Sequence, residues 1–414
     1  MNDRNDHNPS GLLSVDEARS RIFDMLRPIR GDEQLAIRSA LGRVLAEPVI
    51  SGIDVPPYAN SAMDGYALRA ADLPAEGTAT LKLIGRAMAG APFEGRVGAG
   101  ECVRIMTGAK LPDGADTVLM QERVEAEGEQ VRINAGHRPG ENVRHPGEDM
   151  AVGQTVLEPG RRLTPADLGV LASLGIPEVR VRRRLRVAFF STGDELVSLG
   201  QPLGEGQIYD SNRYTLYGML QRCGAELLDM GVIPDRREAV RRAFQDAMSQ
   251  ADVVITSGGV SVGEADYVKQ TLDELGEVHV WRMAMKPGKP LAVGRLGEAT
   301  FFGLPGNPVS AMATFYQFVQ PALERLGGAT PGEPLVLKIP TATDLKKSPG
   351  RLEYQRGVLA RDAHGNWTVT SSGRQGSHVL TSMSRANCFV ILPAKSAGAK
   401  AGELVDVQPF AGLI

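Results

Sequence analysis

A short stretch near the middle of the chain, "ITSGGVSVGEADYV" at 255–268, combines small residues with the carboxylates of Glu264 and Asp266. The apolar run before it predicts a buried strand, and 265–275 has the apolar spacing of a helix. A turn between strand and helix at the edge of an open α/β sheet binds anions, because the first N–H groups of the helix are free. Two bare carboxylates would repel an anion, so they point to a magnesium ion that bridges them to a phosphate.

Three more segments place small and polar residues after predicted strands: "STGDEL" at 191–196, "MKPGKP" at 285–290 and "GLPGNPVSA" at 303–311. Small residues let the backbone approach a ligand closely, and lysines offset the charge of a phosphate. The candidate residues of all these segments are Thr192, Asp194, Glu195, Ser257, Gly258, Gly259, Ser261, Asp266, Lys286, Lys289, Pro305, Asn307, Pro308 and Ser310. Together they predict a pocket for a phosphate-bearing ligand.

Taken singly, each of these features has a structural alternative. Glycine pairs mark tight turns, an acid of "STGDEL" can cap a helix, and Lys286 and Lys289 can be ordinary solvated lysines. Asp235 can cap the helix predicted at 236–249. Several such segments on one predicted sheet edge favour a binding site. The stretch "GGVSVG" is neither a G-x-G-x-x-G motif nor a P-loop, because its last glycine precedes Glu264, and this argues against a dehydrogenase or a P-loop NTPase.

The segments lie in a region, 183–328, where apolar strands alternate with helical patterns. The predicted strands are 185–192, 226–233, 252–257 and 278–285, followed by a hairpin at 290–306. The predicted helices are 212–222, 236–249, 265–275 and 308–326. Such alternation is typical of a mostly parallel sheet with helices on both faces, in which one edge collects the candidate segments.

Outside this region the sequence patterns predict other kinds of domain. We expect a helix over 15–29, and another that begins at Pro165 and ends at Gly175. Short strands broken by glycine and proline predict a β-rich domain over 51–144. Alternating strands after Gly328 predict a small barrel or sandwich over 329–414.

Composition narrows the class of protein. A chain of 414 residues with a formal net charge of −3 predicts several globular domains and no general affinity for nucleic acid. Cys102, Cys223 and Cys388 lie far apart, so we expect neither a disulfide framework nor a structural zinc site. With no signal-peptide pattern and no apolar stretch of membrane-spanning length, we expect a cytoplasmic protein without membrane contact.

Two segments outside the α/β region add polar candidates. "NSAMDGYAL" at 60–68 contains Asp64, and "IMTGAKLPDGADTV" at 105–118 contains Thr107. Each is interpreted as a turn or as a ligand contact.

Read in chain order, the motifs resemble those of one enzyme family. They are "SAMDGYA", "MTGAKLPDGADTV", "STGDEL", "GQIYDSN", "GGVSVGEADY", "MKPGKP" and "GLPGNPVS". In this order they are similar to the MoeA-type molybdopterin molybdenumtransferases, which are related to the E domain of gephyrin. The resemblance implies a discontinuous helical linker domain (10–50 and 145–182) and a β-rich domain (51–144). It also implies a MogA/MoaB-like molybdopterin-binding α/β domain (183–328) and a C-terminal β-barrel (329–414).

The resemblance implies a magnesium-dependent reaction in which molybdenum from molybdate enters adenylated molybdopterin, with release of AMP. The implied catalytic acids are Asp64, Glu195, Asp235 and Asp266, of which Glu195 and Asp266 would hold Mg²⁺. Thr107, Lys286, Lys289, Pro305, Pro308, Arg356 and Ser377 would join Thr192, Ser257, Gly258, Gly259 and Ser261 in binding substrate.

The resemblance also implies partners. We expect a homodimer with a shared active site, in which Asp64 and Thr107 of one chain face the α/β pocket of the other. A MogA-type adenylyltransferase would supply the substrate, and molybdoenzymes would accept the product. Two alternatives stay open: a molybdopterin-binding scaffold without catalysis, and a MogA-type molybdopterin adenylyltransferase.

Overall fold

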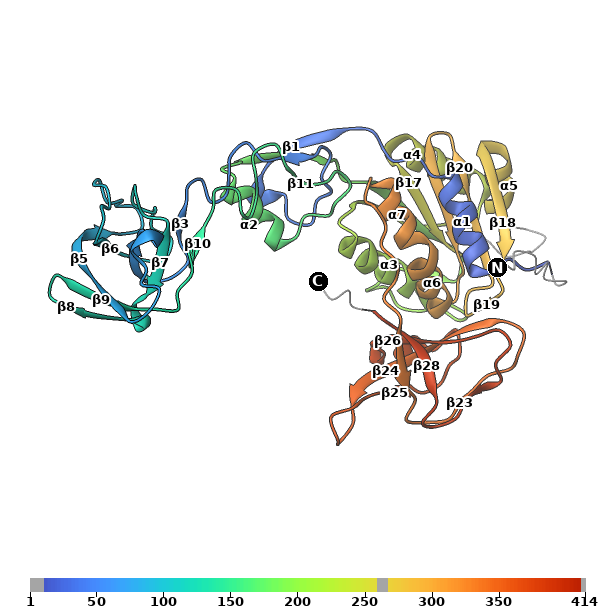
Figure 1. The fold of residues 1–414 in the computed structure, drawn as a ribbon. Coiled ribbons are helices and arrows are strands. Elements are labelled where there is room, and N and C mark those ends of the chain that lie inside the picture. Colours follow the sequence, from blue (N-terminus) through green and yellow to red (C-terminus); the bar gives the residue numbers. More distant parts are fainter. Residues whose placement is uncertain (1–10, 259–266, 411–414) are drawn as a thin grey trace. The chain divides into compact units, whose positions relative to one another are not determined.

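A computed structural model describes residues 11–258 and 267–410 (Figure 1). The predicted site residues Gly259, Ser261 and Asp266 lie outside these ranges. The chain forms two compact units, one of residues 1–33, 42–44 and 181–414, the other of residues 34–41 and 45–180. No helix in the described part of the chain is both long and apolar enough to cross a membrane.

The first unit contains the α/β domain, whose sheet has the strand order β16-β13-β17-β21-β20-β18. These strands are β13 (Arg186–Thr192), β16 (Glu226–Ile233), β17 (Val253–Ser257), β18 (Gly276–Arg282), β20 (Pro290–Leu296) and β21 (Ala299–Leu304). The first four strands in that order run parallel, and β20 and β18 add an antiparallel edge. The expected mostly parallel sheet is confirmed.

Helices cover both faces of this sheet (Figure 1). They are α1 (Val15–Met25), α3 (Ser211–Arg222), α4 (Arg237–Gln250), α5 (Tyr267–Leu275), α6 (Pro308–Thr314) and α7 (Gln320–Leu326). Along β13, Val187 and Phe189 pack with α1, α3, α6 and α7, whereas Ala188 and Phe190 pack with α4 and α5. This alternation explains why the strand is apolar throughout: both of its faces are buried.

Helix α1 is shorter than predicted. It ends at Met25 rather than at 29, because Pro28 cannot continue a helix and disfavours helical geometry in the residue before it. Its buried residues share a hydrophobic core with residues of the α/β domain. Val15, Ala18 and Ile22 form that apolar face.

The helix predicted at 308–326 is interrupted by a π-helical turn, Phe315–Val319. Pro321 has no N–H to donate to the carbonyl of Gln317, so the regular ladder cannot continue there. That carbonyl instead accepts hydrogen bonds from Arg19 Nε and Nη2, at 3.4 and 3.3 Å. The interruption therefore ties α1 to the end of the helix.

The C-terminal domain is a small barrel, one of the two architectures predicted. Its strands are β22 (Leu337–Pro340), β24 (Leu352–Arg361), β25 (Trp367–Ser371), β26 (Cys388–Leu392) and β28 (Leu404–Pro409), with short pairs β23 (Leu345–Lys346) and β27 (Gly398–Ala399) and one helix, α8 (Leu380–Arg385). The sheet runs β24-β26-β28-β22, with β25 beside β24. A bridge between Thr341 and Val369 brings β22 to β25, which closes the ring.

The second unit holds the β-rich domain and the linker region. The β-rich domain has the strand order β7-β4-β6-β5-β9-β8. Its strands are β4 (Gly65–Leu68), β5 (Thr78–Ala87), β6 (Glu101–Ile105), β7 (Thr117–Met120), β8 (Val124–Glu127) and β9 (Gln130–Asn134). The linker contains α2 (Pro165–Ser173), β2 (Val49–Ile50) paired with β11 (Thr155–Leu157), and β3 (Asn60–Ser61) paired with β10 (Val143–Arg144). Thr164 caps α2 with a complete capping box, and Gly175 follows it with φ +71°, as the sequence indicated.

Candidate functional site

The carboxyl ends of the parallel strands meet at a point where the chain order of the sheet reverses. From β13 the chain crosses to β16 on one side and then to β17 on the other, so the turns after β13 and β17 are neighbours. Open α/β sheets bind their ligands at such a switch point. Thr192 and Ser257, the last residues of these two strands, are buried there side by side with the end of β21.

Gly258 packs the three turns against one another. It has φ +90°, and its N–H donates to the carbonyl of Leu304 at 3.2 Å. A Cβ atom at this position would lie 2.9 Å from the carbonyl oxygen of Thr192. Glycine is therefore required both by the backbone conformation and by the close approach of the turn after β13.

Carboxylates gather beside these turns. Asp194 Oδ1 accepts a hydrogen bond from the backbone N–H of Asp235 at 3.1 Å, which joins the turn after β13 to the turn after β16. Asp235 is exposed, but partial desolvation raises the pKa of its carboxyl, and the negative charges of Asp194 and Glu195 raise it further. A cation beside these acids would relieve their repulsion.

Asp235 does not cap helix α4, which was its alternative interpretation. The cap residue is Arg236, and it makes no side-chain cap hydrogen bond. The backbone N–H of Asp235 instead donates to the carboxylate of Asp194. Asp235 thus belongs to the group of acids at the sheet edge.

The acids Glu195 and Asp266 are the predicted ligands of a magnesium ion. Within residues 11–258 and 267–410, no group of three His, Cys, Asp or Glu side chains has an arrangement suited to a metal ion. Glu195 lies in that range, while Asp266, the other predicted ligand, lies outside it. The chemistry of the donors fits the ion, because Mg²⁺ prefers carboxylate oxygens together with phosphate oxygens.

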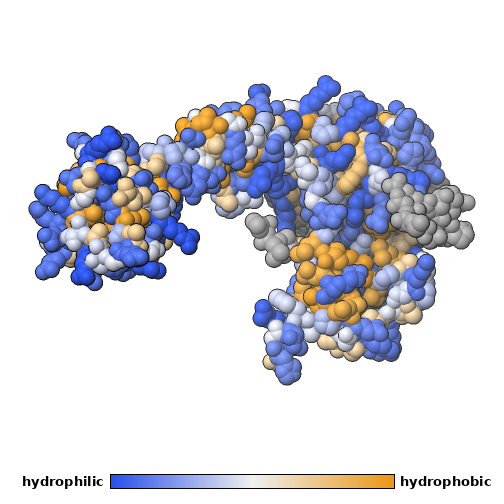
Figure 2. Space-filling view, viewed as in Figure 1, coloured by the Kyte–Doolittle hydropathy of each residue, from blue (hydrophilic) through white to orange (hydrophobic). Residues whose placement is uncertain are grey.

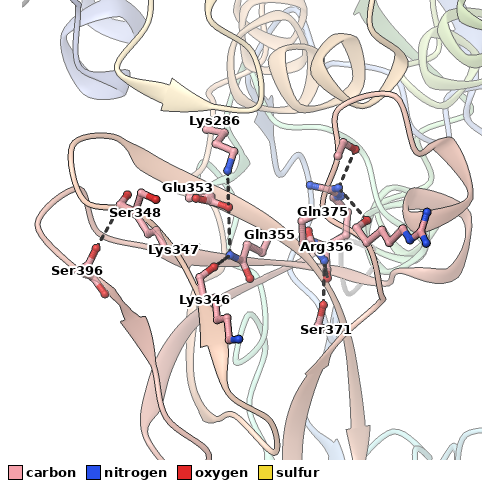
Figure 3. Close-up of polar contacts among 12 residues, drawn as sticks. Lys286, Lys346, Lys347, Ser348, Glu353, Gln355, Arg356, Ser371, Gln375 and Ser396 are labelled. Carbon is pink, nitrogen blue, oxygen red and sulfur yellow. Dashed lines mark hydrogen bonds and ion pairs between the residues drawn. The ribbon is translucent and has the colours of Figure 1, made fainter.

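The segment with the two candidate lysines lies at the same sheet edge, between β18 and β20. Within it, β19 (Met285–Lys286) pairs in parallel with β24 of the C-terminal barrel. Lys286 Nζ lies 3.4 Å from Oε1 of Glu353, whose side chain is only 6% exposed (Figure 3). Gln355 Nε2 donates to the same oxygen at 3.1 Å. Lys286 remains half exposed, and Lys289 is exposed, so both can reach an anion.

Proline and barrel residues frame the start of α6. Pro305 is buried after β21, and Pro308 is the first residue of α6, where a missing N–H costs nothing. The N–H of Val309, also in the first turn, donates to the carbonyl of Ser377 at 3.1 Å. A loop of the barrel, with the predicted residue Ser377, therefore lies against the α6 end of the sheet edge.

Arg356 supports this barrel loop from inside. It is 1% exposed, and its guanidinium donates to Ser382 Oγ at 3.0 Å and to the carbonyl of Gly376 at 3.0 Å. Its backbone is bound by the side chain of Gln375 (Figure 3). Burial lowers the pKa of Arg356 to about 10. The contacts of Arg356 with Gly376 and Ser382 hold the loop that contains Ser377.

In the second unit, Asp64 and Thr107 lie together although 43 positions separate them in the chain. The carboxylate oxygen Oδ1 of Asp64 accepts from both the N–H and the hydroxyl of Thr107, each at 2.7 Å. The backbone N–H and then the hydroxyl hold the pKa of this carboxyl below its ordinary value. Both residues were candidates from the sequence, and the fold brings them into direct hydrogen-bonding contact.

Asn212 is a residue of this region to which the sequence assigned no role. Its Nδ2 donates to Ser257 Oγ and to the carbonyl of Gly306, both at 2.7 Å. It thus connects the turns after β17 and β21 from the start of α3. Its signal in the sequence was the motif "GQIYDSN", which by itself does not reveal the partners of the side chain.

A separate cavity of about 1050 Å³ lies between α1, the π-helical turn and the barrel. Its lining residues include Val15, Arg19, Gln317, Leu352 and Tyr354. Figure 2 shows a patch of hydrophobic residues on the C-terminal domain, on the side next to the α/β domain. None of the candidate site residues among those described lines this cavity, so it is distinct from the sheet-edge site.

Comparison with known proteins agrees with this architecture along the chain. Three family models match: the MoeA N-terminal region (domain I and II) at residues 13–175, a probable molybdopterin binding domain at 188–325, and the MoeA C-terminal region (domain IV) at 338–410. A crystal structure of the molybdopterin biosynthesis moeA protein from Pyrococcus horikoshii is similar over 96% of this chain and 100% of that chain, with a TM-score of 0.83 and 30% identity.

Curated relatives are similar over almost the whole length. A molybdopterin molybdenumtransferase from Haemophilus influenzae is 45% identical over 97% of this chain and 100% of its own length. One from Nostoc is 38% identical over 94% of this chain and 93% of its own. A gephyrin from Dictyostelium discoideum is 35% identical over 95% of this chain and 62% of its own. The chain therefore belongs to the MoeA family of molybdopterin molybdenumtransferases.

Proposed function

We propose that this chain is a transferase of molybdenum cofactor biosynthesis, which inserts molybdenum from molybdate into adenylated molybdopterin and releases AMP with the help of Mg²⁺. The observation that supports it most is the junction after β13, β16, β17 and β21, where anion-binding turns meet Asp194, Glu195 and Asp235. Such a site suits a substrate with a pyrophosphate linkage, whose charge needs both N–H donors and a cation.

Each group has a role in this proposal. The backbone around Gly258, with Thr192 and Ser257, binds phosphate oxygens. Lys286 and Lys289 offset negative charge as water or a molybdate oxygen attacks phosphorus and the bond to the AMP oxygen breaks. Glu195 and Asp266 would hold the magnesium ion, which supplies Lewis-acid stabilisation of the same charge.

We also propose a homodimer with a shared site. Exposed apolar and aromatic side chains on β15 (Ile208–Tyr209) and α3 support it, because Ile208, Tyr209, Tyr214 and Tyr217 are each more than 40% exposed. Surfaces of this kind are typical of protein interfaces. In a dimer, Asp64 and Thr107 of one subunit would face the α/β pocket of the other.

The proposed reaction also requires a supplier and an acceptor. A MogA-type adenylyltransferase would make the adenylated pterin, and molybdoenzymes would take up the finished cofactor, all in the cytoplasm.

Reconstitution of an apo-molybdoenzyme tests the function. Purified protein is incubated with adenylated molybdopterin, molybdate and Mg²⁺, and the activity of the added apoenzyme reports cofactor formation. We expect activity only when all components are present. Tight binding of the pterin without cofactor formation would support a scaffold instead, and consumption of ATP with unadenylated molybdopterin would support an adenylyltransferase.

A further inference from the structure

Asn212 occupies a position from which one side chain can set the geometry of two site turns. It is half buried at the second residue of α3, whose cap is Asp210. Its amide reaches across to the end of β17 and to the turn after β21. The two turns also touch directly, since a Cβ on Gly306 would lie 3.9 Å from Cα of Gly258.

The orientation of the Asn212 amide follows from its partners. The carbonyl of Gly306 can only accept, so the group that faces it at 2.7 Å is the NH₂ end. The same nitrogen faces Ser257 Oγ at 2.7 Å. Ser257 Oγ is thereby the acceptor in this contact, and its own hydrogen is left to donate elsewhere. Among the residues the structure describes, none accepts a hydrogen bond from that hydroxyl.

We propose that Asn212 is a positioning residue that fixes Ser257 as a hydrogen-bond donor toward the phosphate of the substrate and holds the turns after β17 and β21 together. This rests on the function proposed above. An anion accepts hydrogen bonds only, so a serine whose hydroxyl already donates inside the protein would not bind it. Because Asn212 donates to Ser257 Oγ, the hydroxyl hydrogen of Ser257 cannot donate to the Asn212 side chain and is directed toward another acceptor, which we propose is the phosphate.

The test uses Asn212→Ala and Asn212→Asp in the full chain, with KM for adenylated molybdopterin and kcat measured by AMP release. Loss of a hydrogen bond to a charged group weakens binding by roughly tenfold, so KM of Asn212→Ala should rise by about that factor. Asn212→Asp keeps the size of the side chain but accepts from Ser257 and repels the carbonyl of Gly306. Its KM should rise further.

Asn387→Ala is the matched control. Asn387 also clamps a backbone, with its side chain bound to the N–H and carbonyl of Leu359 at 2.7 and 2.9 Å, but it lies in the barrel. Its removal should lower the thermal midpoint and leave KM unchanged. If Asn212→Ala behaved like this control, Asn212 would have only a structural role.

A double-mutant cycle with Ser257→Ala separates the proposed role of Ser257 in phosphate binding from the proposed positioning role of Asn212. If Asn212 acts through Ser257, the double variant Asn212→Ala/Ser257→Ala should have nearly the KM of Ser257→Ala alone. Effects that multiply would overturn the positioning role. A normal KM for Ser257→Ala would instead remove Ser257 from the proposed site, whatever Asn212 does. Should Asn212→Ala fail to fold, Asn212→Asp is combined with Ser257→Ala in the same comparison.

Discussion

At the scale of single residues, Asp235 is an acid held in surroundings that oppose its charge. Partial desolvation is the first cause of its raised pKa, followed by the charges of Asp194 and Glu195. A carboxyl with a raised folded pKa stabilises the fold below its unfolded pKa, and this contribution is lost as pH rises through the folded pKa. At neutral pH the ionised Asp235 therefore costs stability, which is typical of a group retained for function.

Asp235→Asn tests this trade-off. We expect AMP release to fall at least tenfold, because a charge beside the substrate phosphate and its cation is lost. The thermal midpoint at pH 7 should rise, because the repulsion is removed. Asp246→Asn, on the outer face of α4, is a control that should change neither quantity much. Unchanged AMP release by Asp235→Asn would contradict its place among the catalytic acids.

Asp64 should respond in the opposite sense. Its pKa is lowered by Thr107, so its contribution to stability is present above the ordinary value of 3.8 and is lost as pH falls through the lower folded pKa. Asp64→Asn should therefore lower the thermal midpoint at pH 7, and the difference from wild type should shrink near pH 3. Melting curves over this pH range measure both. An equal difference at all pH values would argue against stabilisation by hydrogen bonds from Thr107 to the ionised carboxylate of Asp64.

At the scale of elements, the turn after β17 depends on one glycine. Gly258→Ala places a Cβ at 2.9 Å from the Thr192 carbonyl and at φ +90°. We expect a loss of stability of about 1–3 kcal/mol and a loss of activity, since the strand ends must separate. Gly224→Ala has a similar φ, +73°, but open space around its Cβ, so it isolates the cost of the backbone conformation. Equal activity of the two variants would show that close packing of the turns is not needed.

Much of the α/β domain could be predicted because its buried strands are continuous apolar runs in the sequence. The strand predicted at 226–233 matches β16, and β13 and β17 begin one residue later than predicted. The ends of the helices were harder to predict. The end of α1 at Met25 and the π-helical turn at Phe315–Val319 each depend on a single proline within an otherwise apolar pattern. The pairing of Asn212 with two distant turns has no local signal, since it arises only when the sheet assembles.

At the scale of the whole molecule, the proposed homodimer with a shared site can be tested through its interface. Tyr217, 47% exposed on α3, is a suitable position to weaken such an interface. Tyr217→Ser should shift the protein toward monomer in sedimentation equilibrium and lower AMP release in parallel. Trp367→Ser removes a side chain of 49% exposure from the barrel and should leave assembly unchanged. A fully active monomer would contradict the shared site.

The most direct test of the central claim is AMP release from adenylated molybdopterin by the purified wild-type protein, with molybdate and Mg²⁺ each present or omitted. The proposed function predicts rapid release only when both are present. Release that ignores molybdate, or no release while the pterin remains tightly bound, would contradict molybdenum insertion at this sheet edge.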